Sequence, residues 1–258
     1  MLTRLKRIFL IINFKTMVIT TSALISTELC FAYGITANYP LTLIATSIVF
    51  PVVFSIGGAY KRRESALDQY GIMKAHGKAI YFAARDWLDD PDKAVLDKTR
   101  KRLYELFLAC RILFTEPVSE MRENENRVYD AFSSLSKFIK TDLRGNGLAG
   151  GEVSRCNQYL SKTMVSFERI KHVYQYRTPR TLRAFSDVFV TVLPALYGPY
   201  FAHIAKDFDT HLIYVMPVLF SFILVSLDNI QEHLENPFDQ VGEDDVTINA
   251  EEFLDRLK

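Results

Sequence analysis

The chain of 258 residues contains little of what most enzymes use for chemistry. Its three cysteines, Cys30, Cys110 and Cys156, share no metal-binding or redox spacing, so we expect them to be packing residues. The five histidines form no ligand pattern, and neither a GxSxG segment nor a phosphate-binding loop is present. The sequence gives no support for catalysis, and we do not expect an enzyme.

An excess of positive charge is also missing. The formal net charge is +1, which gives no indication of nucleic acid as a partner. Of the 31 lysines and arginines, 24 lie between residues 61 and 183. Such a concentration of basic residues between apolar segments is typical of a loop or domain on the cytoplasmic side of a membrane protein.

Long apolar runs, by contrast, are abundant. The clearest is Tyr39–Tyr60, whose 22 residues include no charged side chain. At about 1.5 Å per residue this length is enough helix to cross a hydrocarbon layer of about 30 Å. With three other runs it predicts four transmembrane spans: Met17–Ile35, Tyr39–Tyr60, Ala184–Ala205 and His211–Leu227.

Basic residues predict how these spans are oriented. The first 16 residues carry four of them, and the central block both opens and closes with others. The two short loops on the opposite side carry none (Thr36–Asn38) and one (Lys206). The positive-inside rule therefore places both termini and the central block in the cytoplasm, or on the equivalent side of an organelle. The sequence leaves open whether the membrane is a plasma, inner or organelle membrane.

The central block shows helical periodicity and no strand-like alternation. Apolar residues recur every three, four or seven positions after the second span, which we expect to continue as one helix to Asp89. Pro91 suits the first turn of the next helix. Further helices are expected at Asp92–Phe114, Pro117–Leu143 and Glu152–Tyr176, with a glycine-rich loop at Arg144–Gly151.

The chain is thus expected to be an all-α membrane protein in four parts. Residues 1–60 hold an interfacial helix (Arg4–Phe14) and spans 1 and 2, and residues 61–183 form a cytosolic helical bundle. Residues 184–227 hold spans 3 and 4, and residues 228–258 form an acidic cytosolic tail. The third span includes Pro194, Gly198 and Pro199, which spans tolerate where neighbours satisfy the backbone.

Charged groups in the predicted spans allow two interpretations. Glu28 either faces a pathway near its extracellular mouth or lies close enough to the interface to be solvated. Together with Asp187 and His203 it could also serve a proton-coupled carrier.

The tail concentrates carboxylates. Between Glu232 and Asp245 there are six, which could bind Ca²⁺ if loop oxygens converge on the ion. No EF-hand spacing is present, and solvated acidic tails are common, so both interpretations remain open.

Two motifs carry a resemblance to a known family. Glu232–Phe238 reads EHLENPF and is followed by Gly242–Asp245, GEDD. In the second span, Phe50-Pro51 and Phe54 lie one helical turn apart, with Gly58 one turn further on. In this order, over about 240 residues, the features resemble the bestrophin family of pentameric anion channels.

The resemblance implies a function and a set of residues. The chain would form a homopentamer in lipid that conducts chloride or other small anions. Phe50, Pro51, Phe54 and Gly58 would form a hydrophobic pore neck. Lys61, Arg62 and Arg63 would supply vestibule charge or only fix topology, and Asn236, Glu243, Asp244 and Asp245 would be the candidates for Ca²⁺.

Departures from the family pattern are also present. A tryptophan pair usual after the second span is replaced by Glu64–Leu67, and the entry to the third span reads Tyr176–Pro179. Residues 239–241 interrupt the acidic run, and His233 replaces a glutamine of the calcium clasp. The resemblance therefore allows an anion channel without calcium gating. A non-conducting scaffold anchored by its spans, with Phe50 and Phe54 only packing or facing lipid, stays an alternative.

Overall fold

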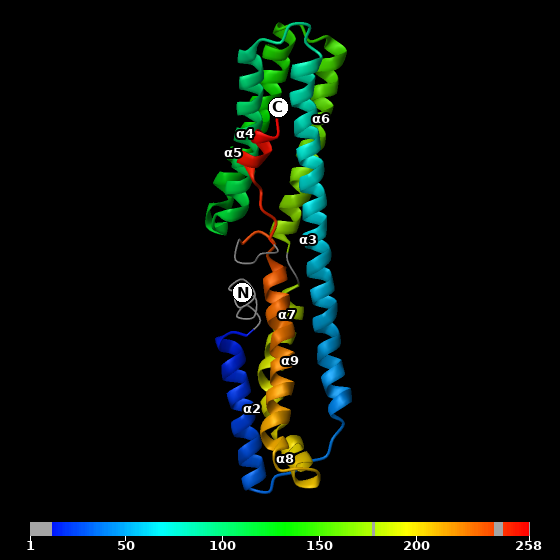
Figure 1. The fold of residues 1–258 in the computed structure, drawn as a ribbon, viewed down its shortest axis with the longest axis vertical. Coiled ribbons are helices and arrows are strands. Elements are labelled where there is room, and N and C mark those ends of the chain that lie inside the picture. Colours follow the sequence, from blue (N-terminus) through cyan, green and yellow to red (C-terminus); the bar gives the residue numbers. More distant parts are fainter. Residues whose placement is uncertain (1–11, 177–178, 240–244, 258) are drawn as a thin grey trace. The chain divides into compact units, whose positions relative to one another are not determined.

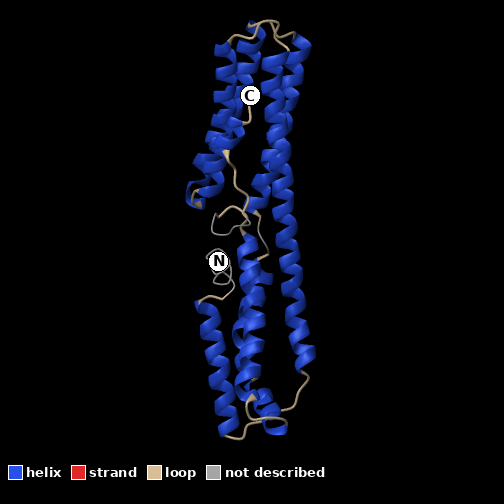
Figure 2. Cartoon of the chain, viewed as in Figure 1, coloured by secondary structure: helices blue, strands red, loops and turns tan. Residues whose placement is uncertain are grey.

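The computed structural model describes residues 12–176, 179–239 and 245–257 of the chain. All regular structure in these ranges is helical (Figure 2). Two compact units result. The apolar unit comprises Met1–Lys61 and Arg177–Glu235, and the polar unit comprises Arg62–Tyr176 and Asn236–Lys258.

The described residues of the apolar unit form five helical segments. It holds α2 (Phe14–Ala32), the first part of α3 (Leu41–Asp86), α7 (Arg180–Leu196), α8 (Gly198–Asp207) and α9 (Leu212–Glu235). Helix α2 begins at a capping box, in which the Asn13 side chain accepts from the backbone N–H of Thr16 and the Thr16 hydroxyl accepts from that of Asn13. The buried core of the apolar unit includes Ile19, Val190, Tyr197, Phe201 and Leu224.

Three helical stretches in the described ranges are long and apolar enough to cross a membrane. They lie in α3, in the run from Gly150 to Asp207 and in α9. Helix α2, predicted as the first of four spans, is not among these three, because Glu28 and several Ser and Thr residues interrupt its apolar sequence. The fold is thus an all-α membrane fold with three such helices in the described ranges.

The predicted third span is not one helix but two. The chain breaks at Tyr197, between α7 and α8. Pro199 has no N–H to donate to the carbonyl of Ala195, four residues before it. The Ser26 hydroxyl of α2 donates to that carbonyl instead, at 2.7 Å. The break is therefore stabilised by a neighbouring helix.

The polar unit is a bundle of long helices. It contains the second part of α3, α4 (Lys93–Thr115), a 3₁₀ turn η1 (Val118–Glu120), α5 (Met121–Phe138), a π-helical turn η2 (Ile139–Leu143) and α6 (Gly150–Gln175). Helices occur where the sequence of the central block predicts them, but α3 ends at Asp86 rather than Asp89, and the stretch predicted as one helix, Pro117–Leu143, consists of η1, α5 and η2. Pro91, however, precedes the N-cap Asp92 rather than lying in the first turn of α4. The predicted loop is shorter than expected, because Gly150 and Gly151 already begin α6.

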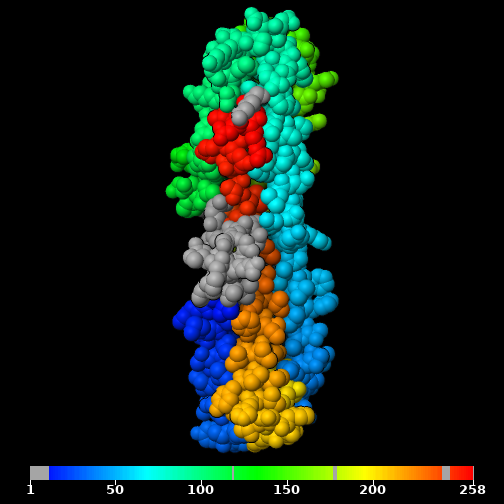
Figure 3. Space-filling model, viewed as in Figure 1, coloured from blue at the N-terminus to red at the C-terminus, as the bar shows by residue number. Residues whose placement is uncertain are grey.

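The tail packs into the core of the polar unit. It ends in α10 (Ala250–Asp255), and Phe238, Val246, Ile248, Phe253 and Leu257 are all almost fully buried. In Figure 1 α10 lies beside α4, and Figure 3 shows it at the surface of the unit. The tail is thus a structural part of this unit and not only a solvated acidic segment.

Candidate functional site

The first part of α3 has two opposite faces. Ile48, Val52 and Ala59 recur at helical spacing and are almost fully buried. Phe50 and Phe54 lie about half a turn away from this buried stripe, since each residue turns an α-helix by about 100°. The two phenylalanines therefore point away from the rest of the apolar unit.

Phe50 and Phe54 form an exposed aromatic pair. Their side chains are 60% and 64% exposed, and their ring centroids lie 4.7 Å apart in an edge-to-face arrangement. Pro51 follows the first ring inside the helix, and Gly58 is half-buried one turn beyond the second. The structure thus brings the four predicted neck residues onto two consecutive turns and leaves the rings uncovered in a single chain.

This part of α3 is also the least enclosed of the membrane-length helices. Only 17% of the residues in its most apolar window are buried, against 44% and 39% in the two other stretches. An apolar helix left this open must be covered by lipid or by other protein. The face that carries the edge-to-face rings of Phe50 and Phe54 is therefore left for lipid or another protein to cover.

The three cations after this segment are not equivalent. Lys61 is exposed, whereas the guanidinium of Arg63 lies 2.6 Å from the carboxylate of Glu64. Lys61 is therefore the exposed cation of the three, whereas Arg62 and Arg63 are half-buried. The replacement of the tryptophan pair by Glu64–Leu67 thus adds a carboxylate beside the basic cluster.

The predicted calcium ligands are only partly covered by the structure. Glu243 and Asp244 lie outside the described residues. The N–H of Val246 donates to the carbonyl of Pro237 at 2.7 Å, so the two ends of the segment from Asn236 to Asp245 lie close together. The Oδ1 atom of Asn236 is buried and accepts no hydrogen bond from the described residues. An oxygen placed this way fits a cation ligand, although the described residues contain no group of three acidic, histidine or cysteine side chains that could hold a metal ion.

The three titratable groups of the carrier hypothesis have separate partners. Asp187 lies 3.6 Å from Lys15 and 3.9 Å from Arg183, at the end of the unit where α7 begins. His203 contacts Asp207, and Glu28 lies near the Tyr214 hydroxyl. These contacts do not form one relay.

The same end of the apolar unit carries a dense ionic network. Lys15 lies 2.5 Å from the buried carboxylate of Asp228, and Arg183 binds both Glu232 and Glu235. Since Glu235 is almost fully buried, Arg183 neutralises a charge that would otherwise be costly. Two of the six predicted calcium-cluster carboxylates, Glu232 and Glu235, are thus already occupied by an arginine.

The docking of the tail was not foreseen from the sequence. Arg111 of α4 holds Glu251 of α10 through two contacts, at 2.5 and 2.9 Å, and this lowers the pKa of Glu251 to about 2. Phe253 stacks on Phe107 at 4.1 Å, directly over Gly77 of α3. The alternation of the buried residues Val246, Ile248 and Ala250 is a sequence signal that could have predicted this burial.

Comparison with known proteins identifies the fold. No model of a known protein family matches the sequence, and no curated protein matches it either. Among solved structures, a bacterial bestrophin homologue from Klebsiella pneumoniae matches with a TM-score of 0.75 at 15% identity, covering 95% of this chain and 94% of that one. A single-residue variant of such a homologue matches with a TM-score of 0.76 at 16% identity, covering 95% and 98%. The chain therefore has a bestrophin-like fold.

Proposed function

We propose that this chain is one subunit of a homopentameric anion channel in a lipid membrane, with its hydrophobic neck on the first part of α3. The observation that carries the proposal is the exposed pair of Phe50 and Phe54, opposite the buried face of the same helix. The bestrophin-like fold supports it. Four membrane crossings, with α2 as the first, and cytoplasmic termini belong to the same proposal.

The physical mechanism follows from the two rings. In a ring of five chains, Phe50 and Phe54 would form two hydrophobic layers, because a step of four residues turns the helix by only about 40° beyond a full turn. A narrow apolar ring gates by dewetting. The positive edges of the aromatic rings favour a passing anion over a cation.

Gly58 limits the length of this neck. It lies where a third bulky residue would add another layer, so we expect a neck of two layers and weaker gating with selectivity retained. Lys61 would attract anions at the end of the pore, and salt would screen this attraction.

Calcium is a secondary part of the proposal. Asn236 and Asp245, with Glu243 and Asp244, would hold the ion. Bound Ca²⁺ would supply a fixed positive charge there. We propose no enzymatic activity.

The test is chloride flux from liposomes containing the purified protein, followed by single-channel recording in planar bilayers. Phe50→Ala and Phe54→Ala should raise the open probability, because each removes one hydrophobic layer. Phe189→Ala is a matched control: Phe185 and Phe189 on α7 are also one turn apart, with ring centroids 4.5 Å apart and partial exposure.

Several results would contradict the proposal. Absence of flux from a folded protein would favour the anchored scaffold, and flux that requires a proton gradient would favour the carrier. Equal currents from the parent protein and both neck variants would refute the assignment of the neck to Phe50 and Phe54 of α3. A monomeric or dimeric mass in detergent would exclude the pentamer.

A further inference from the structure

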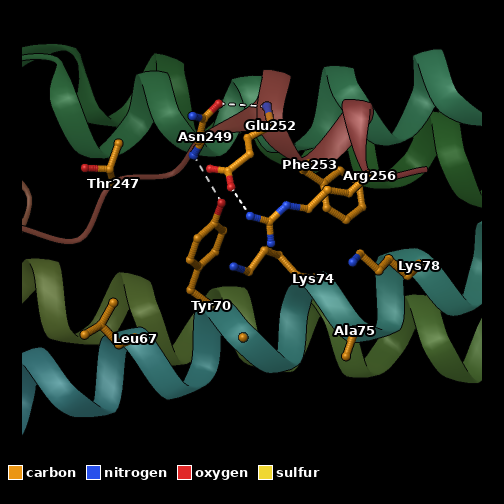
Figure 4. Close-up of a pocket in the computed structure, with 11 residues that line it drawn as sticks. Leu67, Tyr70, Lys74, Ala75, Lys78, Thr247, Asn249, Glu252, Phe253 and Arg256 are labelled. Atoms are coloured by element: carbon orange, nitrogen blue, oxygen red, sulfur yellow. Dashed lines mark hydrogen bonds and ion pairs between the residues drawn. The ribbon is translucent and has the colours of Figure 1, made fainter. Parts of the chain in front are cut away.

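The polar unit contains a cavity of about 470 Å³ between α3 and the tail. Figure 4 shows the residues that line it: Tyr70, Lys74 and Lys78 lie on α3, and Asn249, Glu252 and Arg256 lie on the tail. Its volume lies within the usual range of about 300–1,000 Å³ for small-molecule sites. Both walls belong to the polar unit.

The lining carries an excess of positive charge. The lining contains three cationic side chains, Lys74, Lys78 and Arg256, and one carboxylate, Glu252. Arg256 already binds Glu252, whereas Lys74 lies 4.4 Å from the centre of the Tyr70 ring. Among the residues that the structure describes, neither Lys74 nor Lys78 forms an ion pair. Two positive charges therefore remain available to a ligand.

Tyr70 supplies a directed hydrogen-bond donor. Its hydroxyl accepts the N–H of Asn249 at 3.1 Å, and the side chain is only 6% exposed. Burial raises the pKa of Tyr70, so the hydroxyl keeps its proton at neutral pH. No described residue accepts that proton, and a nearly buried donor without an acceptor is unfavourable.

The rest of the lining is apolar. Leu67, Ala75 and Phe253 line the same space, and no atom lies within 4 Å of where a side chain would begin at Gly71. A bare inorganic ion would leave most of this volume unfilled. The lining suits a molecule that joins an anionic group to a carbon framework.

We infer that this cavity binds a small organic dianion, either a phosphate monoester or a dicarboxylate, and that the ligand clamps the tail onto α3. Its anionic group accepts hydrogen bonds from Lys74, Lys78 and the Tyr70 hydroxyl, and its framework packs on Phe253. Because the ligand contacts both α3 and the segment from Thr247 to Arg256, binding stabilises tail docking. This inference does not depend on ion conduction.

Binding is measured on the full-length protein in nanodiscs, at constant ionic strength, with AMP and succinate as probes. We expect saturable binding of at least one probe, and their relative affinities distinguish a phosphate from a dicarboxylate. Adenosine and succinamide, which lack the charges, should bind at least tenfold more weakly. Limited proteolysis of the tail should slow when the tighter probe is present.

Variants locate the site. Lys74→Gln combined with Lys78→Gln should weaken binding at least tenfold. Lys93→Gln combined with Lys140→Gln is the matched control, because both lysines are exposed on the same unit and lie outside the cavity lining; it should bind like the parent protein. The inference is overturned if no probe saturates, if charged and uncharged probes bind equally, or if the Lys74 and Lys78 variant binds like the control.

Discussion

The close approach of α2 and α8 gives a sharp test of the apolar unit. A Cβ atom added at Gly198 would lie 2.5 Å from Oγ of Ser26, 3.0 Å from its carbonyl carbon and 3.1 Å from its carbonyl oxygen. Ordinary contacts between heavy atoms begin near 3.5 Å, so the added methyl is about 1 Å too close. Two of the three atoms belong to the backbone of α2, and they cannot move without moving the helix.

Gly198→Ala should therefore push α2 away from α8 and weaken the Ser26 hydrogen bond to Ala195. Overpacking of this kind costs about 1–3 kcal/mol, and the lost bond adds about 0.6 kcal/mol in a membrane interior. The apolar unit should therefore unfold more readily in detergent.

Cysteine chemistry reports this displacement directly. Cys30 lies one turn after Ser26 on α2 and is half-buried, whereas Cys110 and Cys156 are fully buried in the polar unit. Gly198→Ala should accelerate maleimide labelling of Cys30 several-fold. Labelling of Cys110 and Cys156 should stay slow, since burial also raises the pKa of the Cys156 thiol to about 11.

Gly71→Ala serves as the control, because no atom lies within 4 Å of its added Cβ and alanine is the better helix former. It should leave Cys30 labelling unchanged. Equal labelling rates and melting temperatures for Gly198→Ala and the parent protein would refute the tight α2–α8 packing.

Three further predictions concern the tail. Phe253→Ala should destabilise the polar unit by about 3–5 kcal/mol and expose the tail to proteolysis. Gly77→Ala, whose Cβ would lie 3.1 Å from the Phe253 ring, should have the same two effects but smaller. Arg111 lowers the pKa of Glu251 to about 2 from an ordinary value of 4.5. The contribution of Glu251 to tail docking is therefore present above pH 4.5 and lost as the pH falls toward 2. Arg111→Gln should remove this acid sensitivity in a tail-cleavage assay. If the acidic segment binds calcium, Ca²⁺ but not Mg²⁺ should raise the melting temperature, and Asn236→Ala should abolish the shift; an equal response to both ions would speak for nonspecific binding.

Local signals explain why most helices could be predicted. Pro91 and Asp92 mark the start of α4, because the residue before a proline is disfavoured in a helix and the aspartate side chain accepts the N–H of Ala94. The apolar stripe through Ala66, Tyr70 and Met73 predicts the continuation of α3, and these residues are buried. Such features depend on neighbours in sequence and need no tertiary information.

The parts that could not be predicted depend on distant contacts. The break at Tyr197 is visible as Pro199, but whether a proline breaks or merely bends a span depends on a donor such as Ser26, about 170 residues away. Helix α10 has six residues, too few to be stable alone, and it is held by Arg111 and Phe107. The cavity at Lys74 exists only because that helix docks.

The evidence for the proposed pore also combines a local sequence signal with information that only the fold supplies. The spacing of Phe50 and Phe54 predicts that the two rings share a face, and the fold adds that this face is turned away from the chain's own core. A carrier would instead need its titratable groups gathered within one chain. Glu28, Asp187 and His203 each lie beside a different group, and these contacts do not link the three residues into a relay within one chain. The proposed path between chains needs an uncovered apolar face, and α3 has such a face at Phe50 and Phe54. The mass of the protein in detergent tests the proposed assembly.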